Sequence, residues 1–400
     1  MRLLARLLVV AILSGLAACA NPIVRVGVPA GLASEAQVTG MSGVRIWGDG
    51  GEQAAKAFIK TELATFRAKY TARAKGGAEP VSHILALSGG ADDGAYGAGL
   101  LVGWSQRGTR PSFDLVTGIS AGALIAPFAF LGRDYDRHLT EVFTLRNGEE
   151  IFRANILAGV LGGPSVADNE PLERLINSYV DQRMLARIAE ERRRGRYLIV
   201  GTTNIDAQRP VFWDMGRIAQ RGDKAALTLF RKVLLASAAL PGIFPPVQID
   251  VQANGQRFTE MHVDGGPTRQ VFVTPGDFHF SDLDQATGVT VKRHLWVIRN
   301  AKILPEYEVV KPTALALGER SLETLTKNQG LGDLKRIYDK AVADNLDFNL
   351  AAVPLDFEAP RPAPFNRDYM QALFARGVDA GRSGNPWMKT LPPAPHGNLR

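Results

Sequence analysis

The chain has 400 residues, of which 46% are hydrophobic, and its 47 basic and 40 acidic side chains give a formal net charge of +7. That length supplies enough apolar residues for one large packed domain or two modest ones. The single cysteine excludes an internal disulfide. The sequence contains no zinc-ligand spacing and no basic patch interleaved with aromatic residues, so no nucleic-acid partner is expected.

The first residues have the pattern of an export signal. Arg2 and Arg6 precede an apolar run at residues 7–13 that is too short to span a bilayer stably. The run Leu-Ala-Ala that ends just before Cys19 resembles the lipobox of bacterial lipoproteins, in which the cysteine carries the lipid. We therefore predict a lipoprotein signal peptide at residues 1–18 and lipidation at Cys19. The alternative is an ordinary signal peptide cut after an alanine.

Lipidation at Cys19 would anchor the chain in the cell envelope of a bacterium. No aspartate follows the cysteine. By resemblance to lipoprotein sorting, this predicts an anchor in the outer membrane that faces the periplasm. Several lipid chains on one protein hold it firmly at a membrane.

Residues 19–80 are predicted to form a tether and an N-terminal helix. Residues 20–50 mix Gly, Pro and Val with little periodicity, which predicts a tether or a loosely packed arm. Residues 52–75 are predicted as an amphipathic helix that packs on the main domain, because apolar residues recur there at helical spacing. These residues are Ala55, Phe58, Ile59, Leu63, Phe66 and Tyr70. A helix lying on a membrane surface is the alternative.

Residues 81–383 are predicted as one domain, followed by a Pro-rich, disordered tail at 384–400. The domain begins strand–helix–strand–helix, which predicts an α/β fold with a parallel sheet covered by helices. The predicted strands lie at 84–87, 113–116, 197–202, 211–213, 257–263 and 294–299. The predicted helices lie at 95–106, 121–131, 172–179, 184–194, 224–237, 315–329, 331–344 and 368–376. Residues 134–180 are mainly helical in this prediction, with a glycine-rich break at 159–163.

The sequence around Ser120 has the form of a nucleophile elbow. Ser120 lies within the run Gly-Ile-Ser-Ala-Gly, between an apolar strand and a helix-forming segment. The glycines permit a sharp turn that exposes the serine oxygen. A Gly-x-Ser-x-Gly match alone is weak, but the strand before it and the helix after it supply the context that the motif requires. Ser120 is therefore the predicted nucleophile of an acyl hydrolase.

A second glycine-rich turn, at residues 88–94, follows the first strand. Its backbone N–H groups are expected to form an oxyanion hole, in which one donor contributes about 3–4 kcal/mol to the transition state. A tight turn without a chemical role is one alternative. A dinucleotide-binding loop is rejected, because Gly94, Gly97 and Gly99 occur in the reverse of the required spacing.

The candidate base is Asp264, which follows a predicted strand and precedes Gly265 and Gly266. An aspartate accepts the serine proton directly if burial or a nearby charge raises its basicity. Of the six histidines in the chain, only His279 approaches a loop at a strand end. The alternative for Asp264 is an Asp-Gly turn that closes a hairpin.

Taken together, these segments resemble the patatin-like phospholipase family. Four blocks occur in the order found in that family, within residues 81–300: the turn at 88–94, the elbow around Ser120, residues 236–246 and the Asp-Gly-Gly run at Asp264. The resemblance implies a three-layer α/β/α fold with a mainly parallel central sheet. It also implies that residues 236–246 shape an acyl pocket beside the site.

The resemblance also implies the chemistry. Ser120 and Asp264 would act as a catalytic dyad, with Gly89, Gly90 and Ala91 forming the oxyanion hole. The reaction would cleave acyl esters of phospholipids or other lipids through an acyl-enzyme, without a metal or another cofactor, as in phospholipase A or lysophospholipase enzymes. The partner would be a lipid or membrane-surface substrate, and the resemblance implies no particular oligomeric state.

The sequence departs from the family pattern at two positions of the glycine-rich turn. Ala91 replaces a third glycine, and Asp93 stands where the family usually has a basic residue. Backbone donors tolerate an alanine if its φ is negative. Asp93 places a negative charge where the family usually has a positive one. We therefore expect the hydrolase chemistry of the family to apply here more closely than its substrate preference.

Two other functions compete with a lipid acyl hydrolase. The first is a non-catalytic envelope lipoprotein that uses the fold as a binding module, which the change at Asp93 favours. The second is a triad esterase for small soluble esters, with Ser120, an acid and either His279 or His294.

Overall fold

The computed structural model describes residues 25–75, 79–145, 153–154 and 167–392. The predicted signal peptide at 1–18, the lipidation site Cys19 and the glycine-rich break at 159–163 lie outside the described residues. Within the described ranges, no helix combines the length and apolarity needed to cross a membrane.

The centre of the molecule is a parallel five-stranded sheet within a larger mixed sheet. Its strand order is β7-β4-β3-β11-β12, and all four of these neighbouring pairs are parallel. The bounds are β7 Tyr197–Asn204, β4 Leu115–Gly118, β3 Val81–Leu87, β11 Lys292–Arg299 and β12 Asp347–Ala352. Leu87 pairs with both Gly118 and Ile298, so the carboxyl ends of three strands meet at one edge.

Antiparallel strands extend this sheet beyond β7. Both β8 and β10 pair with β7, β9 pairs with β10, and the short strands β1 and β2 pair with β9 and β8. The bounds are β1 Gln37–Val38, β2 Arg45–Trp47, β8 Arg209–Asp214, β9 Val247–Ala253 and β10 Gln256–Asp264. A separate two-stranded ladder joins β5 Arg153–Ala154 to β6 Ala167–Asp168.

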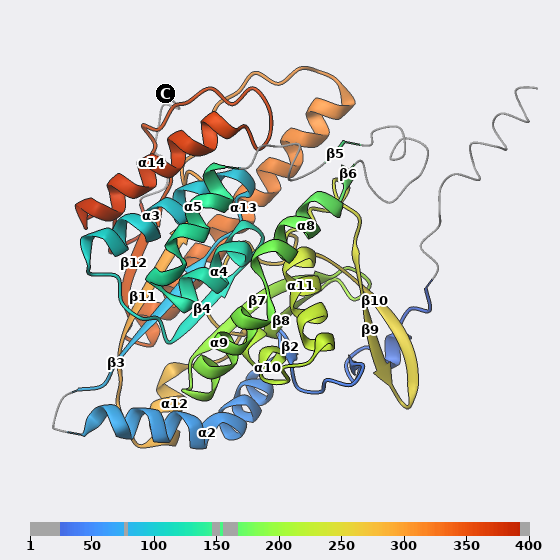
Figure 1. The fold of residues 1–400 in the computed structure, drawn as a ribbon, viewed down its shortest axis with the longest axis vertical. Helices are drawn as coiled ribbons and strands as arrows, with labels where there is room; N and C mark the ends of the chain where they lie inside the picture. The colour runs from blue at the N-terminus through green and yellow to red at the C-terminus, as the bar shows by residue number, and fades with distance from the viewer. Residues whose placement is uncertain (1–24, 76–78, 146–152, 155–166, 393–400) are drawn as a thin grey trace, which may run out of the picture.

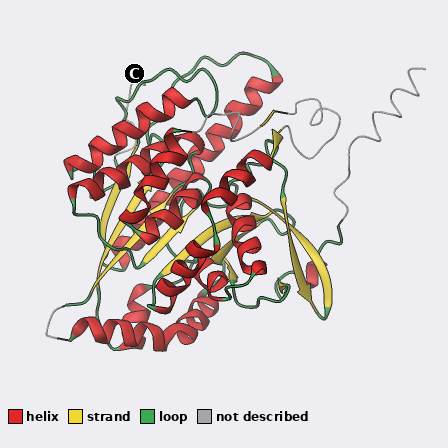
Figure 2. Ribbon diagram, in the orientation of Figure 1, coloured by secondary structure: helices red, strands yellow, loops and turns green. Residues whose placement is uncertain are grey.

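Helices cover both faces of the sheet, which gives three layers (Figures 1 and 2). Along β3, Leu85 and Leu87 pack into one hydrophobic core, while Ile84 and Ala86 pack into another on the opposite face. The first core is shared with α3 Gly94–Arg107, α4 Ala121–Leu131, α5 Asp136–Thr144, α8 Glu170–Tyr179, α9 Gln182–Arg193, α10 Met215–Gln220, α11 Lys224–Ser237 and α14 Arg367–Ser383. The second is shared with α2 Glu52–Ala74, α12 Phe280–Thr287 and α13 Ala314–Ala343. The predicted three-layer α/β/α fold is confirmed.

The helices α3 and α14 lie side by side (Figure 1) and approach each other through glycines. A Cβ atom added to Gly99 would lie 2.1 Å from the carbonyl oxygen of Phe374, and one on Gly103 would lie 2.1 Å from that of Val378. On α14, Gly377 and Gly381 meet the backbone of α3 in the same way. The two backbones are therefore in direct contact.

The sequence predicts most of the inner elements. The structure has helices where they are predicted over 52–75, 121–131 and 224–237, within one residue at each end. It also has the predicted strand pair at 197–202 and 211–213, as β7 and β8. One of these helices, α11, begins at a clear cap, because the Asp223 carboxylate accepts from the N–H of Ala226 at 2.8 Å.

The structure differs from the prediction mainly in the last quarter of the chain. The two helices predicted at 315–329 and 331–344 are one helix, α13, which Gly330 does not interrupt. Gly330 instead gives room to Arg299, whose guanidinium would lie 2.5 Å from an added Cβ. α14 continues beyond its predicted end at residue 376 to Ser383, because Gly377 and Gly381 pack against α3 and do not end the helix. The prediction also lacks β9, β12 and the short helices α10 and α12.

The predicted tether and tail are also partly structured. Residues 36–47 contribute β1 and β2, strands too short for a periodic pattern to reveal, and Val38 and Val44 are buried. In the predicted tail, Trp387 packs against Trp104 and Trp296, with ring centroids 4.9 and 4.8 Å apart. The tail beyond residue 392 lies outside the described residues.

The contact between α3 and α14 predicts a large cost for a single methyl group. Gly99→Ala should lower the free energy of unfolding by about 1–3 kcal/mol, because the methyl group would force two helix backbones apart. Gly318→Ala is the control, since nothing lies within 4 Å of a Cβ there, and it should gain about 1 kcal/mol of helix propensity. Urea unfolding checks both values. Equal effects would contradict the backbone contact.

Candidate active site

Ser120 occupies a strained turn between β4 and α4, with φ 54° and ψ −124°. Such backbone conformations cost about 1–3 kcal/mol for a residue with a side chain. The flanking glycines make the turn possible. A Cβ on Gly118 would lie 2.5 Å from the carbonyl oxygen of Gly122, and a Cβ on Gly122 would lie 2.4 Å from that of Leu87. The backbone therefore has the geometry of the predicted nucleophile elbow.

The last residue of α11 and the segment after it form hydrogen bonds to the backbones of Ser120 and of the candidate base, Asp264. The N–H of Ser120 donates to Ser237 Oγ at 3.1 Å, and that hydroxyl donates to the carbonyl of Gly201 at 2.7 Å. The carbonyl of Ala239 accepts from the N–H of Asp264 at 2.8 Å. The sequence reading expects residues 236–246 near the site, but it does not single out Ser237, because a serine at a helix end carries no specific pattern.

Strand register brings Asp264 level with Ser120. Gly118 on β4 pairs with Val200 on β7, and Asp264 on β10 pairs with Thr202, two residues further along β7. Ser120 lies two residues beyond Gly118 and so reaches the same edge of the sheet. Asp264 is 1% exposed. The structure therefore brings together the two residues that the sequence proposes as a dyad.

The environment of Asp264 makes its carboxylate basic. Oδ1 accepts from the N–H of Gly266 at 2.7 Å, while Oδ2 has no hydrogen-bond partner among the described residues. Burial raises the pKa of Asp264 to about 7, and the nearby Ser120 hydroxyl and the Gly266 N–H partly oppose that rise. No hydrogen bond of normal geometry joins Ser120 to Asp264 here, and such catalytic bonds often tighten only when substrate binds. A base of this pKa suits proton abstraction near neutral pH.

The predicted oxyanion hole needs a correction at Gly89. Its N–H donates to the carbonyl of Gln270 at 3.0 Å and is therefore not free for substrate. The N–H groups of Gly90 and Ala91 donate to no described residue. Ala121, which the sequence reading omits, is the first residue of α4, and its N–H has no acceptor within the helix. Ala121 could have been predicted as a donor, because it directly follows Ser120 in the elbow motif.

The backbone of Ala91 also differs from expectation. Its φ is +49°, in the left-handed region, whereas the sequence reading makes its donor role conditional on a negative φ. Ala91 keeps its N–H without an acceptor among the described residues despite this strain. Beside it, a Cβ on Gly90 would lie 1.9 Å from the carbonyl oxygen of Asn300, so only glycine fits there.

The two carboxylates of the glycine-rich turn face the C-terminal part of the chain. Asp92 accepts from Arg361 Nε at 2.9 Å and from the N–H of Phe365 at 3.0 Å. Asp93 accepts from the Tyr369 hydroxyl at 2.6 Å, and burial raises the pKa of Asp93 to about 6. Asp93 therefore connects the glycine-rich turn to α14. Its carboxylate is hydrogen-bonded to Tyr369 and not to Ser120.

A narrow apolar pocket opens beside Ser120, with a free volume of about 50 Å³. Its walls come from α4, α5, α8 and α14, from the glycine-rich turn and the elbow, and from the segments before α14 and after α11. The lining residues are Ala91, Ser120, Ala121, Leu124, Val142, Phe143, Leu172, Leu175, Ala238, Leu240, Phe244, Phe365 and Met370. No charged side chain is among them, which suits an acyl chain rather than a polar group.

The histidines proposed for a triad lie away from Ser120. His294 on β11 pairs with His83, which lies four residues before the end of β3, so His294 is about 13 Å from the edge that carries Ser120. Its Nδ1 lies 2.6 Å from Asp347 Oδ2. His279 precedes α12 and lies 3.1 Å from Asp344, beyond the far end of α13. Neither histidine is placed to activate Ser120.

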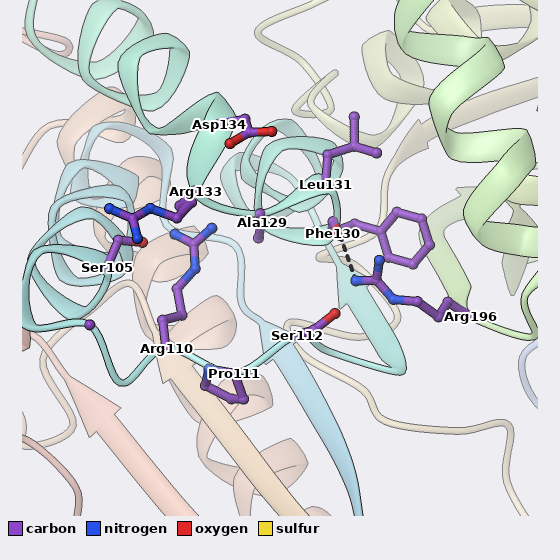
Figure 3. A pocket seen from close by; sticks show the side chains of 12 residues that line it. Ser105, Arg110, Pro111, Ser112, Ala129, Phe130, Leu131, Arg133, Asp134 and Arg196 are labelled. Atoms are coloured by element: carbon purple, nitrogen blue, oxygen red, sulfur yellow. Dashed lines mark hydrogen bonds between the residues drawn. The ribbon is translucent and has the colours of Figure 1, made fainter. Parts of the chain in front are cut away.

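A larger pocket, of about 300 Å³, lies at the opposite end of α4 (Figure 3). α4 has 11 residues, which places this pocket about 16 Å from Ser120. Arg196 donates to the carbonyl of Phe130 at 2.6 Å, and Arg110 donates to that of Leu101 at 3.1 Å. The Phe130 carbonyl lies in the last turn of α4, where a cation is favoured, whereas Leu101 lies in the middle of α3. The pocket contains no nucleophile–base pair.

Among the described residues, no group of three or more His, Cys, Asp or Glu side chains is arranged to hold a metal ion.

Comparison with known proteins identifies a family. Residues 85–275 match the family model described as patatin-like phospholipase. The match includes the glycine-rich turn, the elbow, the segment after α11 and Asp264. A search of curated proteins found no match to the sequence.

Three solved structures resemble the fold distantly. They are VipD from Legionella pneumophila (14% identity, TM-score 0.33), the type III effector protein ExoU (13%, 0.21) and human GIVD cytosolic phospholipase A2 bound to a fluorophosphonate inhibitor (11%, 0.25). The aligned regions cover 77%, 76% and 80% of this chain and 67%, 54% and 51% of those chains, respectively. At these TM-scores, none of them supports a conclusion about the activity of this chain.

The strain at Ala91 predicts a stabilising substitution. Ala91→Gly should raise the free energy of unfolding by about 0.5–1 kcal/mol, because glycine adopts a positive φ without the steric cost of a Cβ. Ala343→Gly, at the exposed end of α13, is the control and should lower it by up to about 1 kcal/mol. Urea unfolding measures both. A loss of stability in Ala91→Gly would contradict the conformation described for the turn.

The burial of Asp264 predicts a pH-dependent cost to stability. Because the folded pKa of about 7 lies above the ordinary aspartate pKa of 3.8, ionising Asp264 destabilises the fold increasingly between pH 4 and 7, and fully above that range. Asp264→Asn removes this cost. Its melting temperature should exceed that of the wild type at pH 8, by about 2–4 °C for each kcal/mol recovered, and the gap should narrow towards pH 4. A constant difference across this range would rule out the raised pKa.

Proposed function

We propose that this chain is a serine acyl hydrolase, because residues 85–275 belong to the patatin-like phospholipase family. The enzyme cleaves acyl esters of phospholipids or related lipids, with Ser120 as nucleophile and Asp264 as base. The observation that carries the proposal is the position of Asp264. A carboxylate with a pKa of about 7 lies at the sheet edge beside a serine in elbow geometry, next to an apolar pocket.

The proposed acylation step uses only groups of this chain. Asp264 takes the proton of the Ser120 hydroxyl as Oγ attacks the ester carbonyl carbon. The N–H groups of Gly90, Ala91 and Ala121 face the negative charge that forms on the carbonyl oxygen. The intermediate then collapses, the alkoxide of the alcohol part leaves, and Asp264 returns the proton to it. The product is an ester between Ser120 and the acyl chain.

The apolar pocket supports a lipid acyl chain as the group transferred to Ser120. The pocket is lined by aliphatic and aromatic side chains. Each methylene group of an acyl chain that is buried against them contributes about 0.8 kcal/mol to binding. Its free volume is too small for a long chain, so side chains such as Phe244 must move apart during binding. We propose an activity of the phospholipase A or lysophospholipase type, with the glycerol part of the lipid outside the pocket.

We also propose that the enzyme acts at a membrane surface of the bacterial envelope. The lipobox-like run ending at Cys19 supports a lipid anchor, and the absence of a following aspartate supports the outer membrane, facing the periplasm. An anchored enzyme meets its substrate in the bilayer without diffusing to it. Labelling with radioactive palmitate tests this proposal, because Cys19→Ala should abolish incorporation and release the protein from membranes.

The nucleophile is tested by labelling and hydrolysis. A fluorophosphonate probe should modify the wild type at Ser120, as mapped by mass spectrometry, and the purified protein should hydrolyse members of a phospholipid and lysophospholipid panel. Ser120→Ala should abolish both reactions, whereas Ser321→Ala, an exposed serine on α13, should change neither. Absence of labelling in the wild type would instead favour the non-catalytic binding module.

The base is tested by pH dependence. The value of kcat/KM should rise with pH to a plateau, with a midpoint near 7, because Asp264 must be ionised to accept the proton. Asp264→Asn should reduce kcat by at least about 100-fold. His279→Ala and His294→Ala should retain activity, whereas a triad esterase would lose it with one of them.

A further inference from the structure

Gln270 places a carboxamide between the nucleophile and the base. A Cβ added to Gly89 would lie 3.1 Å from both Ser120 Cβ and Gln270 Oε1. A Cβ added to Gly266 would lie 2.5 Å from Gln270 Nε2 and 3.0 Å from Asp264 Oδ1. The amide therefore bridges the gap between the glycine-rich turn and the loop that follows Asp264.

The backbone of Gln270 is fixed independently of its side chain. Its N–H donates to Asp333 Oδ2 on α13 at 2.6 Å, and its carbonyl accepts from the N–H of Gly89 at 3.0 Å. Asp333 is 1% exposed and also accepts from Arg336. These bonds hold the loop in place, so the loop does not need the carboxamide for its position.

The carboxamide itself makes no hydrogen bond to any described residue, although Gln270 is only 6% exposed. Neither polar atom of this amide is among the buried side-chain atoms that lack a partner, so the amide keeps some contact with solvent. An amide that is free of protein partners and reached by solvent is available to bind a water molecule. Gln270 is not among the residues that line the apolar pocket, so its amide is separate from the surface proposed to bind the acyl chain.

We propose that Gln270 holds the water molecule that hydrolyses the acyl-enzyme, which makes it a further catalytic residue. This inference rests on the proposed function. The water donates one hydrogen to Gln270 Oε1 and the other to Asp264, which removes it as the water oxygen attacks the carbonyl carbon. The bond to Ser120 Oγ then breaks, and Asp264 returns the proton to Oγ. A fatty acid leaves, and Ser120 is regenerated.

This role assigns different steps to different side chains. The formation of the acyl-enzyme needs Ser120 and Asp264, but no water. Only its breakdown needs a positioned water, so a change at Gln270 should separate the two steps. A residue that merely supports the loop would disturb both, because it would move Gly89 and Asp264 together.

The test is pre-steady-state kinetics with a chromogenic acyl ester. Gln270→Met keeps the length of the side chain but removes its hydrogen-bonding groups, and Gln270→Asn keeps the amide on a shorter stem. Gln270→Met should retain a full first turnover at the wild-type rate, followed by steady-state turnover slowed about 10- to 100-fold. Intact-protein mass should show acylated Ser120 accumulating. Gln252→Met, exposed on β9, is the control and should behave as the wild type.

Hydroxylamine adds a readout that separates the roles. As a strong external nucleophile, it should restore turnover in Gln270→Met, and Gln270→Asn should fall between that variant and the wild type. Equal losses in acylation and deacylation, unchanged deacylation, or failure of both variants to fold would overturn the role of Gln270 alone. Failure of the wild type to form any acyl-enzyme would overturn the proposed function, and this inference with it.

Discussion

The candidate site depends on the direct approach of backbone to backbone at the carboxyl edge of the parallel sheet. Gly118 and Gly122 let the elbow cross against β3, and Gly90 contacts the carbonyl of Asn300 after β11. No side chain fits at these crossings. The resulting strain at Ser120 is held by the bond from its N–H to Ser237 Oγ. The backbone of Ser120 is therefore fixed by the sheet and by α11, and not by contacts of its own side chain.

At the same edge of the sheet, the aspartates that form ion pairs and hydrogen bonds are different from the aspartate that is proposed to react. Three aspartates lie in the loops there, yet Asp92 and Asp93 are bound by Arg361 and Tyr369 from the C-terminal part of the chain. Of the three, only Asp264 has a buried carboxylate oxygen without a hydrogen-bond partner among the described residues. Its raised pKa thus follows from burial without a nearby cation. An added positive charge beside it would lower the pKa and weaken the base.

The part of the site that the sequence predicts is the part that depends on local backbone. The elbow at Ser120, the turn at Gly90 and Ala91, and the strand ending at Asp264 all have short patterns with a steric reason. Ser237 and Gln270 act through contacts with residues more than 100 positions away, so no local pattern marks them. The glycines of α13 and α14 misled the prediction because they serve close packing, whereas glycine in a sequence usually ends a helix.

The contact between α3 and α14 also governs when the site forms during synthesis. The carboxylates of Asp92 and Asp93 obtain their hydrogen-bond partners from residues 361–369, and Gly99 and Gly103 of α3 pack against the backbone of α14. A ribosome-bound chain that ends before residue 361 has Ser120 but lacks the walls formed by Phe365 and Met370. Domains usually fold as units once their interacting segments are available. With this topology, the site around Ser120 is complete only after nearly all of the chain has been made.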